Sequence, residues 1–470
     1  MHKPAFRRSA AALAGLLMAA PLSVYGAGFN LIEQGPRGQG NAFAGAPAIG
    51  ADASTIYFNP AAMTLLDQRE IIAGMNVIDL RGDFTKEEAT DVSGQPLSGG
   101  EGGNIGDGGA LIPNFYYYQP ISDDLHFGMG IGVPFGLATD YEADSIFRYQ
   151  ARRSAVSIIN FNPSLAYRID DQWSVGGGLN FHYMEVELGN AIDLGAACFG
   201  AADPTTCQDF ELTPQAADMD AMIEGDGWGV GFNVGALWEG ERTRVGVHYR
   251  SQVDHSLSGD ARFQLEELND TQLAAFEDLF ANNGFFGFTP GEEVAVGDSG
   301  SVDVDADFKS PDHLSVGIAY ELDDRWTLLG TITRMGWSVF DELVVEFDEE
   351  IAPGQDETRE DQKYEDDWWI SAGFDYHHSD QWTFRAGVAW DETPVQDQYR
   401  TARLPDEDRI WLAAGATWRL NPNSELDIGY THLILDDEIP LDHTGNQGDR
   451  IVGTYEVSTN ILSFQYRYLF

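Results

Sequence analysis

Long stretches of the chain alternate between apolar and polar residues with a period of two. Over residues 173–183, Trp, Val, Leu, Phe and Tyr occur at alternate positions, with mainly Ser, Asn, Gly and His between them. The same alternation recurs over 382–390 and 410–418, with an aromatic residue near one or both ends. Strands that cross a bilayer and its interfaces have this pattern. The stretches exceed the roughly five or six residues of a typical strand in a soluble sandwich.

Fourteen such segments predict an all-β fold, in which residues 69–470 form a 14-stranded antiparallel transmembrane β-barrel. They begin near Arg69, Ala110, Leu125, Ser154, Gln172, Glu224, Arg242, Ser301, Arg325, Asp361, Gln381, Glu407, Ser424 and Gly453. Tight polar connections, such as 122–124 and 170–171, alternate with connections that are generally long. Short periplasmic turns and long extracellular loops are typical of outer-membrane barrels. The last strand ends in Phe470, which resembles the assembly signal of such proteins.

The N-terminal part of the chain fits no strand pattern. Three basic residues precede a short apolar run over 10–20, and small residues follow it, which predicts a cleaved signal peptide over 1–26. The run is far shorter than the roughly twenty residues of a membrane-spanning helix. Residues 27–68 are rich in Gly and Ala, and we expect them to form a hatch, a plug packed inside the barrel lumen.

Two blocks in the first third of the sequence resemble the FadL/TodX (OMPP1) family of outer-membrane transporters for hydrophobic compounds. The first comprises AGFNL at 27–31, GQGNAFAG at 38–45 and NPA at 59–61; the second comprises PFGLATDY at 134–141 and NFNPSLAYR at 160–168. The resemblance implies passive uptake of long-chain fatty acids or related molecules. In that family, substrate passes from extracellular loops to a lumenal pocket and leaves sideways at a kink in the third strand.

The resemblance also implies site residues. Phe29 would lie at the hatch tip near the lumenal pocket, and Asn59, Pro60 and Ala61 would hold the hatch against the barrel wall. In the third strand, alternating glycines and a proline are poor ladder residues. A kink is therefore expected there, although the proline could instead simply end the strand. The kink residues are Gly132, Pro134, Phe135 and Gly136.

Two extracellular loops are predicted to carry apolar helices. The first helix would begin at Thr213, with Met219, Met222 and Ile223 on one face. The second, over 270–280, would carry Leu273, Phe276 and Phe280 on one face, with Phe285 and Phe286 after it. The two faces either pack against each other or form an open groove for an apolar ligand.

The net charge and the two cysteines limit which partners and which covalent or metal sites the chain can have. The formal charge of −49 excludes nucleic acid as a partner. Cys198 and Cys207 would meet an oxidising compartment, which favours a disulfide, although two unpaired thiols remain the alternative. Asp303, Asp305 and Asp307 lack the glycine and the closing glutamate of a calcium loop. We therefore expect no enzyme activity, no cofactor and no metal site.

The expected partners are a hydrophobic small molecule, outer-membrane lipid and lipopolysaccharide, and the expected state is a monomer. Two other functions fit the same layout: a structural or adhesive surface barrel, and a channel for aromatic or alkane hydrocarbons. A general porin would need an open, polar lumen in place of the hatch.

Overall fold

The structure is a computed structural model of the 470-residue chain. It describes residues 27–470 except 103–104, 106–108, 267 and 436–437. The predicted signal peptide, residues 1–26, lies outside the described residues.

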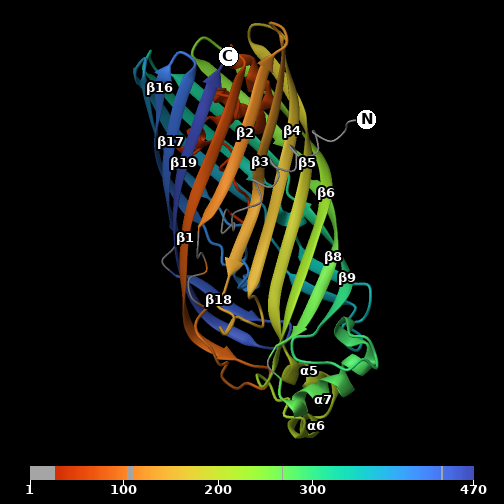
Figure 1. Cartoon of the computed structure of the whole chain (residues 1–470). Helices are drawn as coiled ribbons and strands as arrows, with labels where there is room; N and C mark the ends of the chain where they lie inside the picture. The colour runs from red at the N-terminus through yellow and green to blue at the C-terminus, as the bar shows by residue number, and fades with distance from the viewer. Residues whose placement is uncertain (1–26, 103–104, 106–108, 267, 436–437) are drawn as a thin grey trace, which may run out of the picture.

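The described residues form a single closed antiparallel sheet that is drawn as a tall cylinder in Figure 1. The strand segments are β1 (Glu70–Thr90), β2 (Ala110–Pro120), β3 (Leu125–Asp140), β4 (Arg153–Arg168), β5 (Trp173–Asp193), β6 (Asp218–Glu239), β7 (Thr243–Arg250), β8 (Val253–Leu265), β9 (Ser299–Ser310), β10 (His313–Glu321), β11 (Trp326–Met335), β12 (Glu342–Phe347), β13 (Glu357–Asp361), β14 (Asp367–Ser379), β15 (Trp382–Asp391), β16 (Arg409–Asn421), β17 (Ser424–Leu435), β18 (Ile439–Thr444) and β19 (Arg450–Leu469).

The predicted count of fourteen strands is confirmed. Five strands are each interrupted once, so that β7 and β8, β9 and β10, β11 and β12, β13 and β14, and β17 and β18 lie end to end. The first and last strands close the cylinder through a ladder that runs from Glu70 opposite Leu469 to Thr90 opposite Arg450. Most strands begin within a few residues of the predicted positions.

The barrel is apolar outside and polar inside. On β5, the side chains of Trp173, Val175 and Leu179 are exposed on the outer surface, whereas Asn180 and His182, at positions of opposite parity, are buried. The outer surface faces lipid in a membrane, so these exposed apolar side chains are buried by the bilayer.

No described helix is long and apolar enough to cross a membrane.

The two ends of the barrel differ. The short turns and the C-terminus lie at one end, and helices α5 (Leu194–Ala201), α6 (Pro204–Asp209) and α7 (Asp270–Leu279) lie at the other (Figure 1). Long loops mark the extracellular end of an outer-membrane barrel. Helix α7 occupies the predicted segment, and the side chains of Asn269 and Gln272 form a capping box at its start.

The other predicted loop helix is wrong. Residues 214–216 form a turn, and Met219, Met222 and Ile223 belong to β6, which begins six residues before the predicted sixth strand. Apolar residues spaced three or four positions apart are compatible with a helix, but some of them can also share one face of a strand. Whether a helix or a strand forms then depends on hydrogen bonding to neighbouring strands. Here 218–239 pairs with β5 along its whole length, so a strand extending beyond the membrane forms. The loop's helices are α5 and α6 instead.

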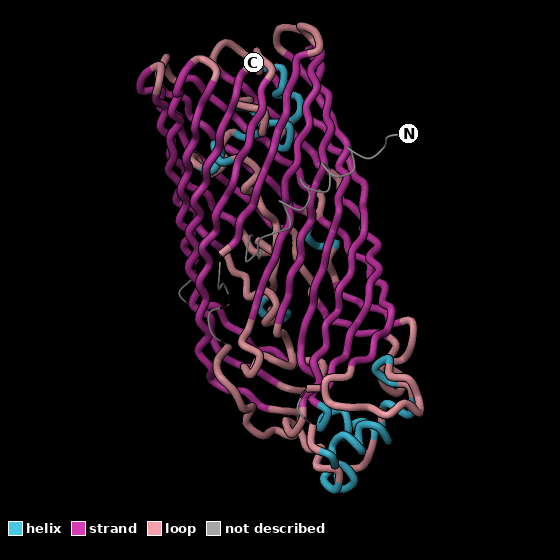
Figure 2. Tube along the Cα trace, in the orientation of Figure 1, coloured by secondary structure: helices cyan, strands magenta, loops and turns pink. Residues whose placement is uncertain are grey.

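Residues 27–66 lie inside the cylinder, where Figure 2 shows short helical turns surrounded by strands. These turns are α2 (Pro36–Gln39), α3 (Ala46–Ile49), α4 (Thr55–Phe58) and the 3₁₀ helix η1 (Pro60–Leu65). We call residues 27–66 the hatch. They are largely buried and contact the inner faces of strands around the barrel, including β3 to β7, β10, β16, β17 and β19.

Glycines and ion pairs hold the hatch in place. A Cβ atom added to Gly246 of β7 would overlap the carbonyl oxygen of Pro47, so only glycine lets the hatch approach this closely. Nearer the periplasmic end, Arg37 lies 3.3 Å from Glu425 and 3.2 Å from Asp427 on β17. These buried pairs attach the hatch to the wall, and breaking one partner of such a pair is strongly destabilising.

We predict that Gly246→Val prevents the hatch from seating while the barrel still closes, because the overlap is confined to the Pro47 contact. Single-channel recording should then show an open, ion-conducting state. Gly330→Val is the matched control. A Cβ atom added to Gly330 would lie 3.5 and 3.7 Å from its nearest neighbours, which are ordinary contact distances. Wild-type conductance in the Gly246 variant would contradict the proposed packing.

Candidate functional site

A cavity of the extracellular half lies between the loops and the barrel rim, and it has a volume of about 450 Å³. We call it the outer cavity. Its apolar lining comes from β5, β6, β8, β12 and the loops, and it includes Leu188, Ile192, Ala221, Ile223, Phe263, Phe280, Phe286, Leu343, Val345, Phe347 and Ile351. Polar side chains complete the lining, among them Gln150, Asn190, Glu360, Arg403 and His443. A lining that combines apolar side chains with polar groups can bind and orient an amphiphilic small molecule.

The predicted loop residues divide between this cavity and the packing behind it. Phe280, Phe286 and Ile223 line the outer cavity. Phe276 is fully buried against Phe280 and Phe286, at ring-centroid distances of 5.6 and 6.3 Å. The remaining predicted residues are not part of the lining: Met219, Met222, Leu273 and Phe285. The loop aromatics therefore pack on one another and also leave a cavity on one side.

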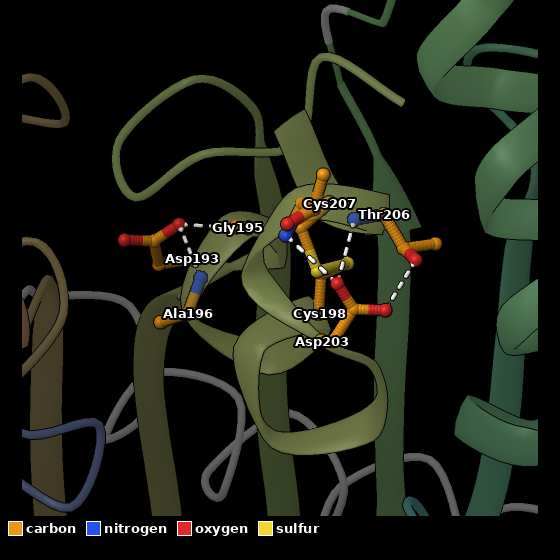
Figure 3. The surroundings of a disulfide bond; sticks show 8 residues. Asp193, Gly195, Ala196, Cys198, Asp203, Thr206 and Cys207 are labelled. Atoms are coloured by element: carbon orange, nitrogen blue, oxygen red, sulfur yellow. Dashed lines mark hydrogen bonds between the residues drawn. A yellow bond between two sulfur atoms is a disulfide. The ribbon is translucent and has the colours of Figure 1, made fainter. Parts of the chain in front are cut away.

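Cys198 and Cys207 form a disulfide between α5 and α6 (Figure 3). Asp193 accepts hydrogen bonds from the first amides of α5, and Asp203 caps α6 in the same way. Both cysteines are buried in the apolar cluster that contains Phe276. The disulfide and the caps thus fix the two short helices over the mouth of the barrel.

A second cavity lies deeper in the lumen, above the hatch tip. This lumenal cavity has a volume of about 90 Å³, and Phe29, Leu137, Val156, Met184 and Phe308 are among its apolar lining residues. Six residues line both cavities: Leu188, Ile223, Leu343, Val345, Thr401 and Arg403. The two cavities are therefore neighbours, and together they mark a route from the loops to the hatch.

Phe29 is the end of that route. Its ring is buried and contacts the rings of Phe135 on β3, Phe308 on β9, and Trp337 and Phe340 between β11 and β12, at centroid distances of 4.7 to 6.2 Å. Edge and tilted contacts of this kind stabilise aromatic clusters beyond simple burial. The sequence pattern did not single out Trp337 and Phe340. Their only signal was an aromatic pair interrupting a strand pattern.

The third strand is irregular at the predicted residues. The ladder between β3 and β4 shifts register between Gly132 and Phe135, and β3 pairs with β2 only up to Ile131. The strand nevertheless continues to Asp140, so the alternative that Pro134 ends it is wrong.

The hatch tip takes the place that β2 leaves. The Leu31 amide donates to the carbonyl oxygen of Pro134 at 2.8 Å, and the Gly136 amide donates to the carbonyl oxygen of Phe29 at 2.9 Å. Residues 29–31 therefore cover part of the free edge of β3, as an added strand covers a sheet edge.

The Asn59 side chain joins two parts of the hatch to each other and to the barrel wall. Its side-chain amide donates to the carbonyl oxygens of Pro47 at 2.7 Å and Ala236 of β6 at 3.1 Å. Its carbonyl oxygen accepts from the Ala61 amide at 3.0 Å, and Pro60 occupies the first position of η1. The position and bonds of these three residues support the anchoring role that the motif implies.

A loop carboxylate holds the start of the hatch. The Gly28 amide donates to Asp406, in the loop between β15 and β16, at 2.8 Å. Burial raises the pKa of Asp406, and the neighbouring Arg409 guanidinium opposes that rise. Asp406 is thus paired with a cation while it also binds the backbone beside Phe29.

A closed barrel with an apolar exterior, an internal hatch and linked apolar cavities defines an outer-membrane transport protein. Residues 17–470 match the family model described as outer membrane protein transport protein (OMPP1/FadL/TodX). The chain belongs to this family, and it is therefore an outer-membrane protein that crosses the membrane many times.

Relatives cover nearly the whole chain. A putative outer membrane protein of Neisseria meningitidis serogroup B is 31% identical over 465 residues, which are 96% of each protein. The long-chain fatty acid transport protein of Escherichia coli K12 is 29% identical over 443 residues, 92% of this chain and 93% of the relative.

Solved structures share the fold. A Pseudomonas aeruginosa FadL homologue superposes with a TM-score of 0.81 at 24% identity, over 94% of this chain and 99% of the homologue. The Ralstonia pickettii toluene transporter TbuX gives a TM-score of 0.62 at 18% identity, over 93% and 98% of the two chains.

We predict that replacing both Cys198 and Cys207 by Ser loosens α5 and α6 without opening the barrel. A disulfide that closes so short a loop contributes about 2–3 kcal/mol to local stability. Limited proteolysis should therefore cleave residues 194–212 faster in the variant, whereas the heat-dependent gel mobility of the barrel should not change. Equal cleavage of variant and wild type would show that the helices do not depend on the disulfide.

Proposed function

We propose that the protein takes up long-chain fatty acids or related hydrophobic molecules across the outer membrane by passive diffusion. The observation that carries this proposal is the route from the outer cavity to Phe29, which ends where β3 has lost β2 as a neighbour. A fatty-acid transport protein among the relatives supports the substrate class.

The energetics favour two successive sites. Burying a methylene group is worth roughly 0.8 kcal/mol, so a long acyl chain gains on the order of 10 kcal/mol in a dry pocket. A single deep site of that strength would hold its cargo. Passage through the outer cavity, the lumenal cavity and then the bilayer divides the gain into steps, and each step exchanges one apolar environment for another.

The lumenal cavity is too small for such a chain as it stands. Its volume of about 90 Å³ lies well below the roughly 300–1,000 Å³ of typical ligand sites. An entering chain must therefore displace a lining side chain, and the Phe29 ring fills the bottom of the cavity. Because the Phe29 carbonyl and the Leu31 amide bind β3, displacement of this segment would free the strand edge.

In this proposal the cargo leaves sideways at β3. The ladder between β2 and β3 ends at Ile131, and the register shift between Gly132 and Phe135 interrupts the ladder between β3 and β4 just beyond it. An apolar molecule released there passes directly into the hydrocarbon of the bilayer. The hatch behind it blocks the axial path to the periplasm.

The other candidate functions differ in what they require. A structural or adhesive barrel needs no cavity, and the linked cavities therefore favour transport. A general porin needs an open polar lumen, which the hatch occupies. A channel for aromatic or alkane hydrocarbons would use the same route. Uptake of labelled oleate, alkane and toluene by a host that lacks its own transporter distinguishes these cargoes. We also propose that the protein acts as a monomer in contact with lipid and lipopolysaccharide, without cofactor or catalysis.

We predict that Asn59→Ala impairs uptake while the barrel stays folded. The variant loses two buried hydrogen bonds of about 1 kcal/mol each and a cap of about 1 kcal/mol, so the hatch should loosen. Asn59→Asp keeps the cap but turns a buried carboxylate oxygen toward the carbonyl oxygens of Pro47 and Ala236, so its loss of uptake should be at least as large. Labelled oleate uptake at equal surface level is the measurement.

Asn421→Ala is the matched control, because Asn421 ends β16 at an exposed periplasmic turn, and among the described residues its side chain bonds only the amide of Asn423. Its uptake should equal that of wild type. Wild-type uptake in both Asn59 variants would refute the anchoring role.

A further inference from the structure

Arg403 lies at the neck between the two cavities. It belongs to the loop between β15 and β16, and it lines both the outer and the lumenal cavity. Among the described residues that line the lumenal cavity, it is the only cationic side chain. Its side chain is 15% exposed, so its charge is largely removed from bulk water.

The guanidinium of Arg403 has unused hydrogen-bonding capacity. Its Nη1 atom donates to the Ser154 hydroxyl at 2.9 Å and approaches the Arg153 carbonyl oxygen at 3.5 Å. Its Nε atom is buried and makes no hydrogen bond with any described residue. A guanidinium carries five N–H donors, so most of them have no partner within the described chain.

Among the described residues, Arg403 has one anionic partner, and the ion pair between them is long. Glu360 of β13 lies 3.5 Å from the Arg403 Nε atom. The other oxygen of Glu360 accepts a hydrogen bond from Gln362, a lumenal-cavity residue, at 2.9 Å. Nearby loop pairs are closer: Arg400 lies 2.8 Å from Glu407, and Arg148 lies 2.9 Å from Asp218.

A cation placed in an apolar neck is costly unless an anion compensates it. Removing a guanidinium from water carries a penalty of several kcal/mol, which good ion-pair geometry must offset. A neutral hydrocarbon passing the neck supplies no such compensation. A carboxylate does, because it accepts two parallel N–H bonds from a guanidinium fork.

We propose that Arg403 recognises the ionised carboxylate of an acyl ligand at the neck between the cavities. The carboxylate takes the free donors of the guanidinium in competition with Glu360, while the acyl chain extends toward Phe29. The inference rests on the proposed function and narrows its cargo to amphiphilic monocarboxylic acids rather than neutral hydrocarbons. The acidic surface of the protein repels such ligands at long range, and Arg403 supplies the local attraction.

The test compares two probes with the same hydrocarbon chain. Oleate and oleyl alcohol differ in the carboxylate alone, and their binding to the purified full-length protein in nonionic detergent is measured by calorimetry at alkaline pH, where oleate is ionised. Arg403→Met removes the cation, and Arg403→Lys keeps the charge without the fork. Glu360→Gln removes the competing anion.

We expect Arg403→Met to weaken oleate binding by at least about tenfold, the size of a lost charge-assisted hydrogen bond. Binding of oleyl alcohol should change less than about twofold. Arg403→Lys should restore part of the oleate affinity, and Glu360→Gln should strengthen oleate binding. The matched controls are Arg262→Met and Glu224→Gln, because these two residues pair with each other at an exposed site that lines neither cavity. Both controls should bind both probes as wild type does.

Equal weakening of oleate and oleyl alcohol in Arg403→Met would mean that Arg403 only holds its loop, and it would overturn the inference. Unchanged oleate affinity would overturn it as well. Either result leaves the proposed function standing, because the wild-type protein still binds the acyl chain. A wild-type protein that binds neither probe would instead reject the proposed function itself.

Discussion

The hydrocarbon core of a membrane offers the backbone no hydrogen-bond partner. The closed wall of this barrel, and the way the hatch is held inside it, both follow from that constraint. Each amide and carbonyl of the wall must be paired within the protein, which only helices and closed barrels achieve. Here β1 pairs with β19 and the ladder continues around the cylinder. The outward side chains are then free to be apolar, and the inward ones can bind a hatch through hydrogen bonds and ion pairs.

The edge of β3 is the place where this rule and the proposed function meet. Beyond Ile131, β3 no longer pairs with β2, and residues 29–31 of the hatch supply hydrogen-bond partners in its place. The same three residues carry the Phe29 ring into the lumenal cavity. A ligand that displaces the ring therefore acts on the backbone that covers the edge. In the proposed function, this arrangement would join cargo binding to opening of the wall, without a separate gate.

The sequence predicted the features that depend on local pattern. Period-two alternation and tight polar turns gave fourteen strands, and the NPA triplet singled out Asn59, whose bonds indeed reach the wall at Ala236. The oxidising compartment favoured the disulfide between Cys198 and Cys207, which the structure contains. Local pattern misled at Met219 and Met222, because spacing alone does not separate a short amphipathic helix from a strand that gains its pairing partner elsewhere.

The sequence could not predict features that require distant segments to meet. Phe29 touches Trp337 and Phe340, which lie more than three hundred residues away, only because the barrel closes around the hatch. The position of Arg403 between two cavities depends on how its loop folds back over the mouth. Neither residue type nor sequence spacing indicates that a residue will lie between two cavities. Closure of the barrel, which brings these segments together, is a property of the whole sheet.

The most direct measurement is amide hydrogen exchange at Leu31 and Gly136, the two donors that join the hatch tip to β3. The protein in detergent would be compared with and without oleate. Oleate should accelerate exchange at these two amides while the ladder between β1 and β19 keeps its protection. Unchanged or slower exchange at both amides in the presence of bound oleate would contradict this prediction.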